Sequence, residues 1–294
     1  TVFDCFGAGQ RITRSTFGGR TWRSDPALAP DIFRAFMIML DLHEIMWHLE
    51  QALALPAGPD HAELASHLDR IAAWAEHNAK LLERGQWLTG KNFAALKYTG
   101  PGTDLTLGLA DGHAWKGGRS NSRNGIVCNP NIPTEEVFTT PHAMRVEGHV
   151  RSTKPLSHNG TLIENIEVKF EGGRIVEAHA TKGEAVLTKV LDTDEGSRRI
   201  GEVALVPHSS PISASGVLFY NTLYDENAAC HIALGQCYAD CFVGGTKMSP
   251  EEIQQRGGNK SLVHVDWMIG SDQIDIDGVK PDGSCVPVMR GGEW

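Results

Sequence analysis

The stretch SLVHVDWMIGS, residues 261–271, alternates between apolar and polar side chains in the manner of a half-buried β-strand. Side chains two positions apart in a strand project from the same face, so His264 and Asp266 should point in the same direction. Both occupy positions that would otherwise be apolar, and a histidine satisfied within a core would not need an acid two residues further on. The pair therefore indicates a metal-binding or catalytic face.

A second informative stretch is ENAACHIALGQCYADCF, residues 226–242, which we predict to be a helix. His231 and Tyr238 are seven residues apart, so on a helix they would share one face, two turns apart. Glu226 would lie at the start of this helix. An acid at that position can bind a metal ion, but it can equally be a structural partner of the helix end.

Two further acidic segments carry candidate ligands. Glu202 interrupts the apolar stretch RIGEVALV, residues 199–206, which is typical of a strand. A carboxylate in such a stretch is costly to bury without a partner, although a glutamate at a solvent-exposed sheet edge would show the same pattern. Glu135 and Glu136 follow Pro133, and two acids at the start of a helix or turn are also favourable with the helix dipole alone.

Together these segments contain six side chains that bind metals and one nearby tyrosine. They are Glu136, Glu202, Glu226, His231, His264 and Asp266, with Tyr238. Carboxylates and imidazoles that converge from separate elements describe a metal centre, and a centre rich in carboxylates suits two hydrolytic metal ions.

Composition restricts the class of protein. The chain has 294 residues, of which 41% are hydrophobic, enough for one large domain or two ordinary ones. Its formal net charge of −9 argues against a nucleic-acid partner, and no stretch approaches the roughly 20 apolar residues of a membrane span. No secretory signal is visible, and the six cysteines include no C-x-x-C pair. We therefore expect Cys230, Cys237 and Cys241 to be buried free thiols, and the location to be cytoplasmic.

The pattern of the chain changes near YTGPG, residues 98–102. Before it we predict an apolar helix over residues 31–55 and a second helix that begins after Asp60 and ends near Gly85. Beyond it we predict short strands, among them a hairpin that turns at residues 172–173. The expected fold is therefore α/β, with a mainly helical N-terminal part (residues 1–97) and a mixed α/β catalytic domain (residues 98–294) carrying a dinuclear metal site.

Two other motifs are not expected to form the site. His43 and Glu44 with His48 resemble the zinc motif HExxH, but the second histidine comes one residue too late to share the helix face. His208 and Ser209 suggest a serine hydrolase, but no G-x-S-x-G turn surrounds them.

Five strings in the second part of the chain carry a family resemblance. They are TGPGTDLTLGL, NIPTEEVFTTP, GEVALVP, LFYNTLYDENAACHIALG and HVDWMIGS, in this order. Read together, they resemble the thermophilic metalloaminopeptidase family, the aminopeptidase T, AmpS and PepS type. The resemblance covers residues 96–294, and five unrelated strings must coincide to produce it. Members of the family carry a longer α/β N-terminal domain than the residues that precede this match.

The resemblance implies a dinuclear metal centre that removes N-terminal residues from peptides, within a homodimer. The ligand positions of the family fall on Glu136, Glu202, Glu226, His231, His264 and Asp266, and its active-site tyrosine falls on Tyr238. We expect two divalent metal ions, with zinc favoured and cobalt, manganese or magnesium as alternatives. Glu202 is expected to bridge the ions.

Several roles stay open at this level. Glu135 and Glu136 are the candidates for the general base, and Tyr238 could bind a metal or donate to the tetrahedral oxyanion. The expected partners are peptides with a free N-terminus. A different amidohydrolase with the same dinuclear centre, such as an amidase or a deacylase, is the first alternative, and a catalytically silent binding protein of the same fold is the second.

Overall fold

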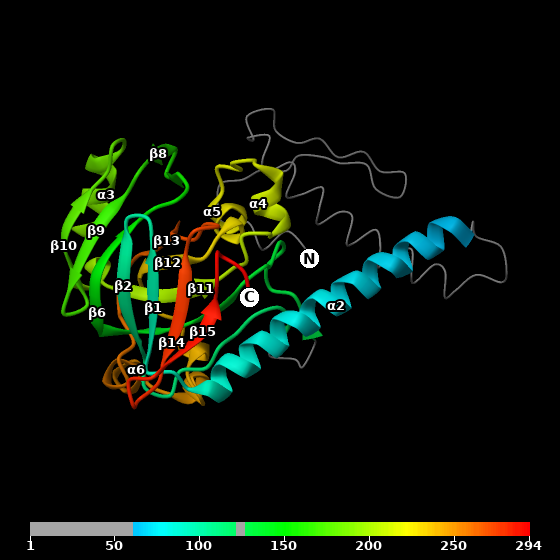
Figure 1. Cartoon of the computed structure of the whole chain (residues 1–294), viewed down its shortest axis with the longest axis horizontal. Helices are drawn as coiled ribbons and strands as arrows, with labels where there is room; N and C mark the ends of the chain where they lie inside the picture. Colours follow the sequence, from blue (N-terminus) through cyan, green and yellow to red (C-terminus); the bar gives the residue numbers. More distant parts are fainter. Residues whose placement is uncertain (1–60, 122–126) are drawn as a thin grey trace. The chain divides into compact units, whose positions relative to one another are not determined.

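The structure, a computed structural model, describes residues 61–121 and 127–294 (Figure 1). The chain divides into two compact units, residues 1–73 and 74–294, and both β-sheets described below lie in the second. The predicted helix over residues 31–55 and the motif at His43, Glu44 and His48 lie outside the described residues.

Helix α2, His61–Lys91, is longer than predicted. Its expected end at Gly85 is wrong, because the glycine lies inside the helix and packs against another segment. A Cβ atom at Gly85 would lie 3.5 Å from the carbonyl oxygen of Trp115, an ordinary van der Waals contact. The helix ends instead before Asn92, whose φ of 46° is the left-handed conformation that commonly terminates helices.

The larger sheet has seven strands, all paired in antiparallel fashion, in the order β10-β9-β6-β2-β1-β14-β15. Their bounds are Ala95–Gly100 (β1), Thr103–Leu109 (β2), Pro141–Arg151 (β6), Glu167–Glu171 (β9), Arg174–His179 (β10), Asp275–Val279 (β14) and Cys285–Met289 (β15). The predicted hairpin is confirmed as β9 and β10. Gly172 and Gly173 both adopt positive φ in its turn, a conformation that glycine tolerates without steric cost.

The smaller sheet has four antiparallel strands in the order β13-β12-β11-β5. Their bounds are Val137–Thr139 (β5), Ile200–Leu205 (β11), His231–Gly235 (β12) and His264–Met268 (β13). The strands predicted around Glu202 and around His264 are confirmed as β11 and β13.

The helix predicted over residues 226–242 is wrong. A short 3₁₀ turn, Glu226–Ala228, is followed by the strand β12, and a second 3₁₀ turn follows at Ala239–Cys241. All five residues of β12 are buried, since the strand is central and covered on both faces. A short apolar run of this kind has no period that separates a strand from a helix, so only its pairing partners decide.

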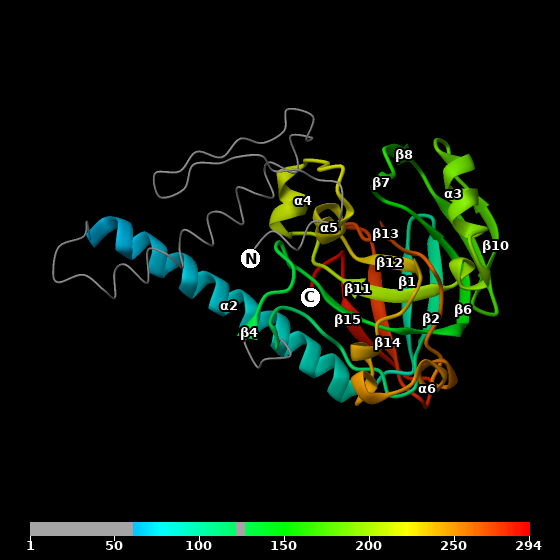
Figure 2. The same cartoon turned by 180° about the vertical axis from the view of Figure 1, so that it is seen from behind.

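Shorter elements lie in the connections between these strands. They are β3 (Ser120–Asn121), β4 (Val127–Cys128), β7 (Leu156–His158), β8 (Thr161–Ile163), α3 (Glu184–Leu191), α4 (Pro211–Ser215), α5 (Thr222–Asp225) and α6 (Pro250–Gln255). Helix α3 lies beside β10 at one end of the larger sheet (Figures 1 and 2). None of the helices in the described ranges is both long and apolar enough to cross a membrane.

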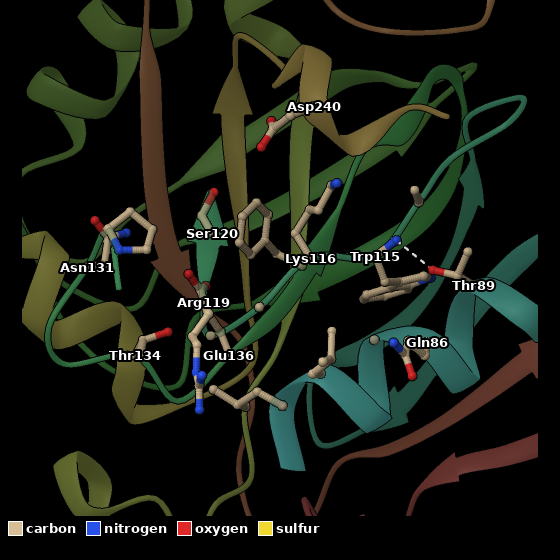
Figure 3. A pocket seen from close by; sticks show the side chains of 18 of the residues that line it. Gln86, Thr89, Trp115, Lys116, Arg119, Ser120, Asn131, Thr134, Glu136 and Asp240 are labelled. Carbon is tan, nitrogen blue, oxygen red and sulfur yellow. Dashed lines mark hydrogen bonds between the residues drawn. The ribbon is translucent and has the colours of Figure 1, made fainter. Parts of the chain in front are cut away.

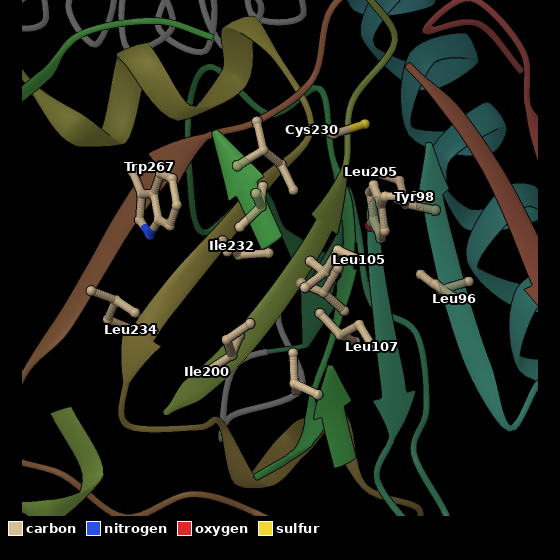
Figure 4. Close-up of a cluster of buried hydrophobic side chains, with 14 of the residues drawn as sticks. Leu96, Tyr98, Leu105, Leu107, Ile200, Leu205, Cys230, Ile232, Leu234 and Trp267 are labelled. Carbon is tan, nitrogen blue, oxygen red and sulfur yellow. The ribbon is translucent and has the colours of Figure 1, made fainter. Parts of the chain in front are cut away.

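The core lies between the two sheets (Figure 4). The larger sheet contributes Leu96 and Tyr98 from β1 and Leu105 and Leu107 from β2. The smaller sheet contributes Ile200, Leu205, Ile232, Leu234 and Trp267 from β11, β12 and β13. Because side chains alternate along a strand, the intervening residues of the smaller sheet point away from this core.

The described residues thus combine antiparallel sheets with helices, in keeping with the α/β composition predicted. The cysteines predicted as buried free thiols, Cys230, Cys237 and Cys241, are free and buried. The division of the chain at residues 97 and 98 stays a prediction; strand β1, which pairs with β2 and β14, spans that position.

Candidate metal centre

The candidate site occupies the face of the smaller sheet that points away from the core. In β12 the core side chains Ile232 and Leu234 alternate with His231 and Ala233. In β13 the same alternation places His264 and Asp266 together, as predicted. Glu202 of β11 joins them on this face, beside a register irregularity between Ile200 and Glu202.

The register of three strands sets the width of the site. Ala233 of β12 lies directly opposite Glu202 of β11 on one side and Asp266 of β13 on the other. Strands are about 4.8 Å apart, so the backbones carrying the two acids are separated by about 9.6 Å. Only the methyl group of Ala233 lies between them, which leaves room above the sheet for the carboxylates to converge.

A first group of potential ligand atoms comes from Glu136, Glu202 and His231, whose atoms lie within 4.8 Å of one another. Glu136 immediately precedes β5. The imidazole Nε2 of His231 lies 3.1 Å from Glu136 Oε2 and 3.9 Å from Glu202 Oε1. All three side chains are buried.

A second group comes from Glu202, His264 and Asp266, again within 4.8 Å. His264 Nε2 lies 3.6 Å from Glu202 Oε2 and 3.5 Å from Asp266 Oδ1. Glu202 therefore belongs to both groups, and it presents Oε1 to one histidine and Oε2 to the other.

Both histidines are oriented by backbone carbonyl groups. His231 Nδ1 lies 3.1 Å from the carbonyl oxygen of Ala229, and His264 Nδ1 lies 2.8 Å from that of Gln236. A carbonyl oxygen can only accept, so each Nδ1 carries the hydrogen. In the neutral ring the Nε2 lone pair is then left facing the carboxylates, which is the arrangement in which protein histidines bind metal ions.

The buried polar atoms of the first group lack hydrogen-bond partners. Glu136 Oε2 and His231 Nε2 are both buried, and although they lie 3.1 Å apart, neither makes a hydrogen bond of acceptable geometry among the described residues. Nor does any described lysine or arginine form an ion pair with Glu136, Glu202 or Asp266. Unpaired buried groups of this kind are expensive, and a divalent cation is the partner that suits clustered carboxylate and imidazole ligands.

The crowding of acids shifts the pKa values of the site. Burial, followed by the charges of Asp266 and Glu136, raises the pKa of Glu202 well above its usual value, and the same causes raise the pKa of Glu226. Burial alone would lower the pKa of His231. Contact with Glu136 and the charges of the other acids outweigh it, so the pKa of His231 is raised well above its usual value.

Two of the predicted ligands lie beside the groups rather than in them. Glu226 is buried at the 3₁₀ turn before β12 and senses the charges of Asp266 and Glu136, but its oxygens fall outside both groups. Tyr238 follows β12, with its ring centroid 4.8 Å from that of His264. Burial and the charge of Glu202 raise the pKa of Tyr238, which keeps its hydroxyl group neutral and able to donate.

The two segments that carry Glu136 and Glu226 are tied together by Asn227. The backbone N–H of Glu135 donates to Asn227 Oδ1 at 2.7 Å, and Asn227 Nδ2 donates to the carbonyl oxygen of Leu223 at 2.9 Å. Glu135 contacts His77 of α2, with 3.6 Å between Oε1 and Nε2. Only the pairing of distant segments reveals these roles.

A cavity of about 750 Å³ lies beside the site (Figure 3). Its wall includes the segment from Ala114 to Asn121, the α2 residues from Leu81 to Gly90, and Glu136 and Phe138 on either side of the first residue of β5. The Phe138 ring lies edge-on to Tyr238, with 6.4 Å between centroids. The rings of Phe138, Tyr238 and His264 therefore form a continuous series of contacts from the cavity wall to the second ligand group.

The fold and this face define a mixed α/β protein with a candidate metal centre rich in carboxylates. Residues 60–294 match the family described as thermophilic metalloprotease (M29). The chain belongs to this family.

Similar proteins include aminopeptidase T of Thermus thermophilus, 50% identical over 273 residues, a match that covers 93% of this chain and 65% of that protein. Aminopeptidase T of Thermus aquaticus is 56% identical over 226 residues, which cover 77% of this chain and 55% of that protein. The solved structure of wild-type AmpT from Thermus thermophilus superposes with a TM-score of 0.73 at 55% identity, covering 76% of this chain and 55% of that one. The chain thus matches between 55% and 65% of the length of these relatives.

Proposed function

We propose that the chain is a metal-dependent aminopeptidase that removes N-terminal residues from peptides at a centre of two divalent ions. The observation that carries the proposal is the position of Glu202. Its two carboxylate oxygens face two different histidines, in two ligand groups that share no other residue. A carboxylate placed in this way suits a bridge between neighbouring metal ions. Membership of the metalloprotease family supports the same reading.

Each of the two ligand groups would hold one metal ion. Glu136 and His231 would hold one ion, His264 and Asp266 would hold the other, and Glu202 would hold both. Glu226, which is buried beside these groups, would complete one of the shells, and Tyr238 would either do the same or act as a hydrogen-bond donor. Mixed oxygen and nitrogen ligands are compatible with zinc, which we favour, and with cobalt, manganese or magnesium.

Two ions bound here would polarise the scissile carbonyl group and lower the pKa of a water molecule. The residues of the chain supply the remaining functions. The neutral hydroxyl of Tyr238 would donate a hydrogen bond to the oxygen that becomes negatively charged. Glu135 and Glu136 are the candidates for accepting a proton: the Glu136 carboxylate faces the ligand groups, and the Glu135 carboxylate contacts His77.

Selectivity for the N-terminus would come from the acidic surroundings of the site. A free substrate amine could bind one of the ions or pair with a nearby carboxylate, and an acetylated amine could not. We therefore expect kcat/KM for an N-acetylated peptide to be at least about 10²-fold lower than for the free peptide, which corresponds to a charge-assisted contact of a few kcal/mol.

The test compares free and acetylated forms of one peptide with the metal-loaded protein. Equal cleavage of both forms would favour an amidase or deacylase, and release of internal fragments would indicate an endopeptidase. Absence of any cleavage despite bound metal would favour the silent binding protein. The homodimer and the cytoplasmic location stay predictions, and light scattering of the 32.0 kDa chain tests the former.

A further inference from the structure

Lys116 is the outermost member of a row of residues that lie opposite one another on adjacent strands. The row runs from Lys116 through Phe138 and Ala204 to His231 of the candidate metal centre. The backbone of Lys116 forms an antiparallel bridge with Phe138 of β5, with both N–H···O distances at 2.8 Å. Phe138 lies opposite Ala204 of β11, and Ala204 lies opposite His231 of β12. Residues directly opposite each other in antiparallel strands share one face of the sheet, so Lys116 projects from the face that carries His231.

The neighbours of Lys116 agree with this placement. Trp115 is buried in the core on the other side of the segment, while Lys116 is half-buried and lines the cavity beside the site. Its ammonium group has no acidic partner within ion-pair distance in the described part of the chain. Asp240 is the acid on the side of the cavity toward which Lys116 points (Figure 3), and it too makes no such ion pair.

The distance between Lys116 and the site matches a short peptide. Three strand spacings separate the backbones of Lys116 and His231, about 14 Å in all. An extended peptide covers roughly 3.4 Å per residue, and the lysine side chain shortens the gap further. Two or three residues after the scissile carbonyl group are therefore enough to reach from the ligand groups to the Lys116 ammonium group.

We infer that Lys116 binds the C-terminal carboxylate of tri- and tetrapeptide substrates, so that the cavity holds the leaving part of a short peptide. The inference rests on the proposed aminopeptidase function for its orientation, because the N-terminal residue must lie at the ligand groups. A carboxylate is the partner that an unpaired ammonium group in a partly enclosed cavity recognises most strongly. Longer peptides place their carboxylate outside the cavity and lose this contact.

The experiment measures binding rather than turnover. Trialanine and trialanine amide are titrated into the chelator-treated 294-residue protein by calorimetry. The acid should bind at least about fivefold more tightly than the amide, in line with a partly solvated charge pair. The Lys116→Met variant should remove this difference and Lys116→Arg should retain it. Lys97→Met, an exposed lysine of β1 outside the cavity, serves as the matched control and should leave the ratio unchanged.

Further arms separate the competing explanations. Asp240→Asn should increase the preference for the acid, because it removes the nearby negative charge. If the C-terminal carboxylate is the true ligand, an amidated tripeptide that ends in glutamate should exceed trialanine amide in affinity by less than trialanine itself does. Equal affinity for acid and amide, no binding of either, or loss of the preference in Arg119→Met instead of Lys116→Met would overturn the inference.

The binding experiment and the test of the proposed activity can fail separately. Hydrolysis of leucine para-nitroanilide by the metal-loaded protein tests the aminopeptidase function alone, since this compound has no carboxylate. A protein that cleaves the anilide but binds acid and amide equally keeps the function and loses the Lys116 subsite.

Discussion

Glu202 and Asp266 lie on the same face of the smaller sheet, two strands apart, and each is directly opposite Ala233 of the strand between them. The small side chain of Ala233 leaves space in which the two carboxylates can approach common ligands. A larger side chain at this position would occupy that space without removing any proposed ligand. The register of β12 is therefore as important to the site as the ligands themselves.

Replacing Ala233 with leucine should reduce metal binding by more than half, although every ligand residue remains. The added atoms would project between Glu202 and Asp266, where a buried site tolerates extra volume poorly. Elemental analysis after dialysis against metal should find fewer than half of the wild-type ions. Ala233→Gly keeps the space open and should bind the full amount. A leucine variant with the full metal content would show that the ligands converge elsewhere.

Removal of the shared carboxylate should affect both ions. We expect Glu202→Gln to lose about two metal ions per chain, whereas His264→Ala should lose about one, because the structure places His264 in one group only. Glu177→Gln, on the exposed face of β10, is the matched control and should retain both. Equal losses from the variants of Glu202 and His264 would contradict the assignment of Glu202 as a bridge.

Asn227→Ala should weaken metal binding without touching a ligand. The substitution leaves the partly buried N–H of Glu135 without its acceptor and releases the segment that carries Glu136. Loss of partners that orient ligands typically lowers metal affinity by about 10- to 100-fold. The metal-free variant should also unfold at a lower urea concentration, because its free energy of unfolding is lower by about 1–3 kcal/mol. Reduced stability with unchanged metal affinity would assign Asn227 a structural role only.

The metal-free protein should lose stability as the pH rises. The folded-state pKa of Glu202 is raised, first by burial and then by the charges of Asp266 and Glu136. A group of this kind stabilises the fold fully below its unfolded pKa of about 4.3, and the contribution is lost as the pH rises through the higher folded value. Calorimetry in chelator from about pH 5 to 8 should show a falling Tm, with a smaller fall in Glu202→Gln. Parallel curves for the two proteins would show that Glu202 does not titrate in this way.

Addition of a divalent ion should reverse this trend. Metal binding requires the carboxylates in their charged form and releases the protons that the raised pKa values retain. The increase in Tm on adding zinc should therefore be larger near pH 8 than near pH 5. An increase that does not depend on pH would indicate binding outside the acidic cluster.

Local sequence patterns predicted a large part of this arrangement. The alternation around His264 and Asp266 depends only on the period of a half-buried strand, and it identified β13 and the shared face of the two ligands. The apolar run around Glu202 identified β11, and two glycines identified the turn between β9 and β10. The choice of Glu136 and Glu226 depended on the family resemblance, because two acids beside a turn have no pattern of their own.

The tertiary structure alone decided which segments meet. Residues 232–235 are apolar on both faces because they lie in a buried central strand, and this removes the period that would have distinguished the strand from a helix. The alignment of Ala233 with Glu202 and Asp266, the hydrogen bond from Glu135 to Asn227, and the row from Lys116 to His231 all join residues far apart in the chain. The sequence by itself determined the ligand types and the local strands, since these depend on neighbouring residues. Strand register decided how the ligands converge, because pairing between distant strands depends on the packing of the whole core.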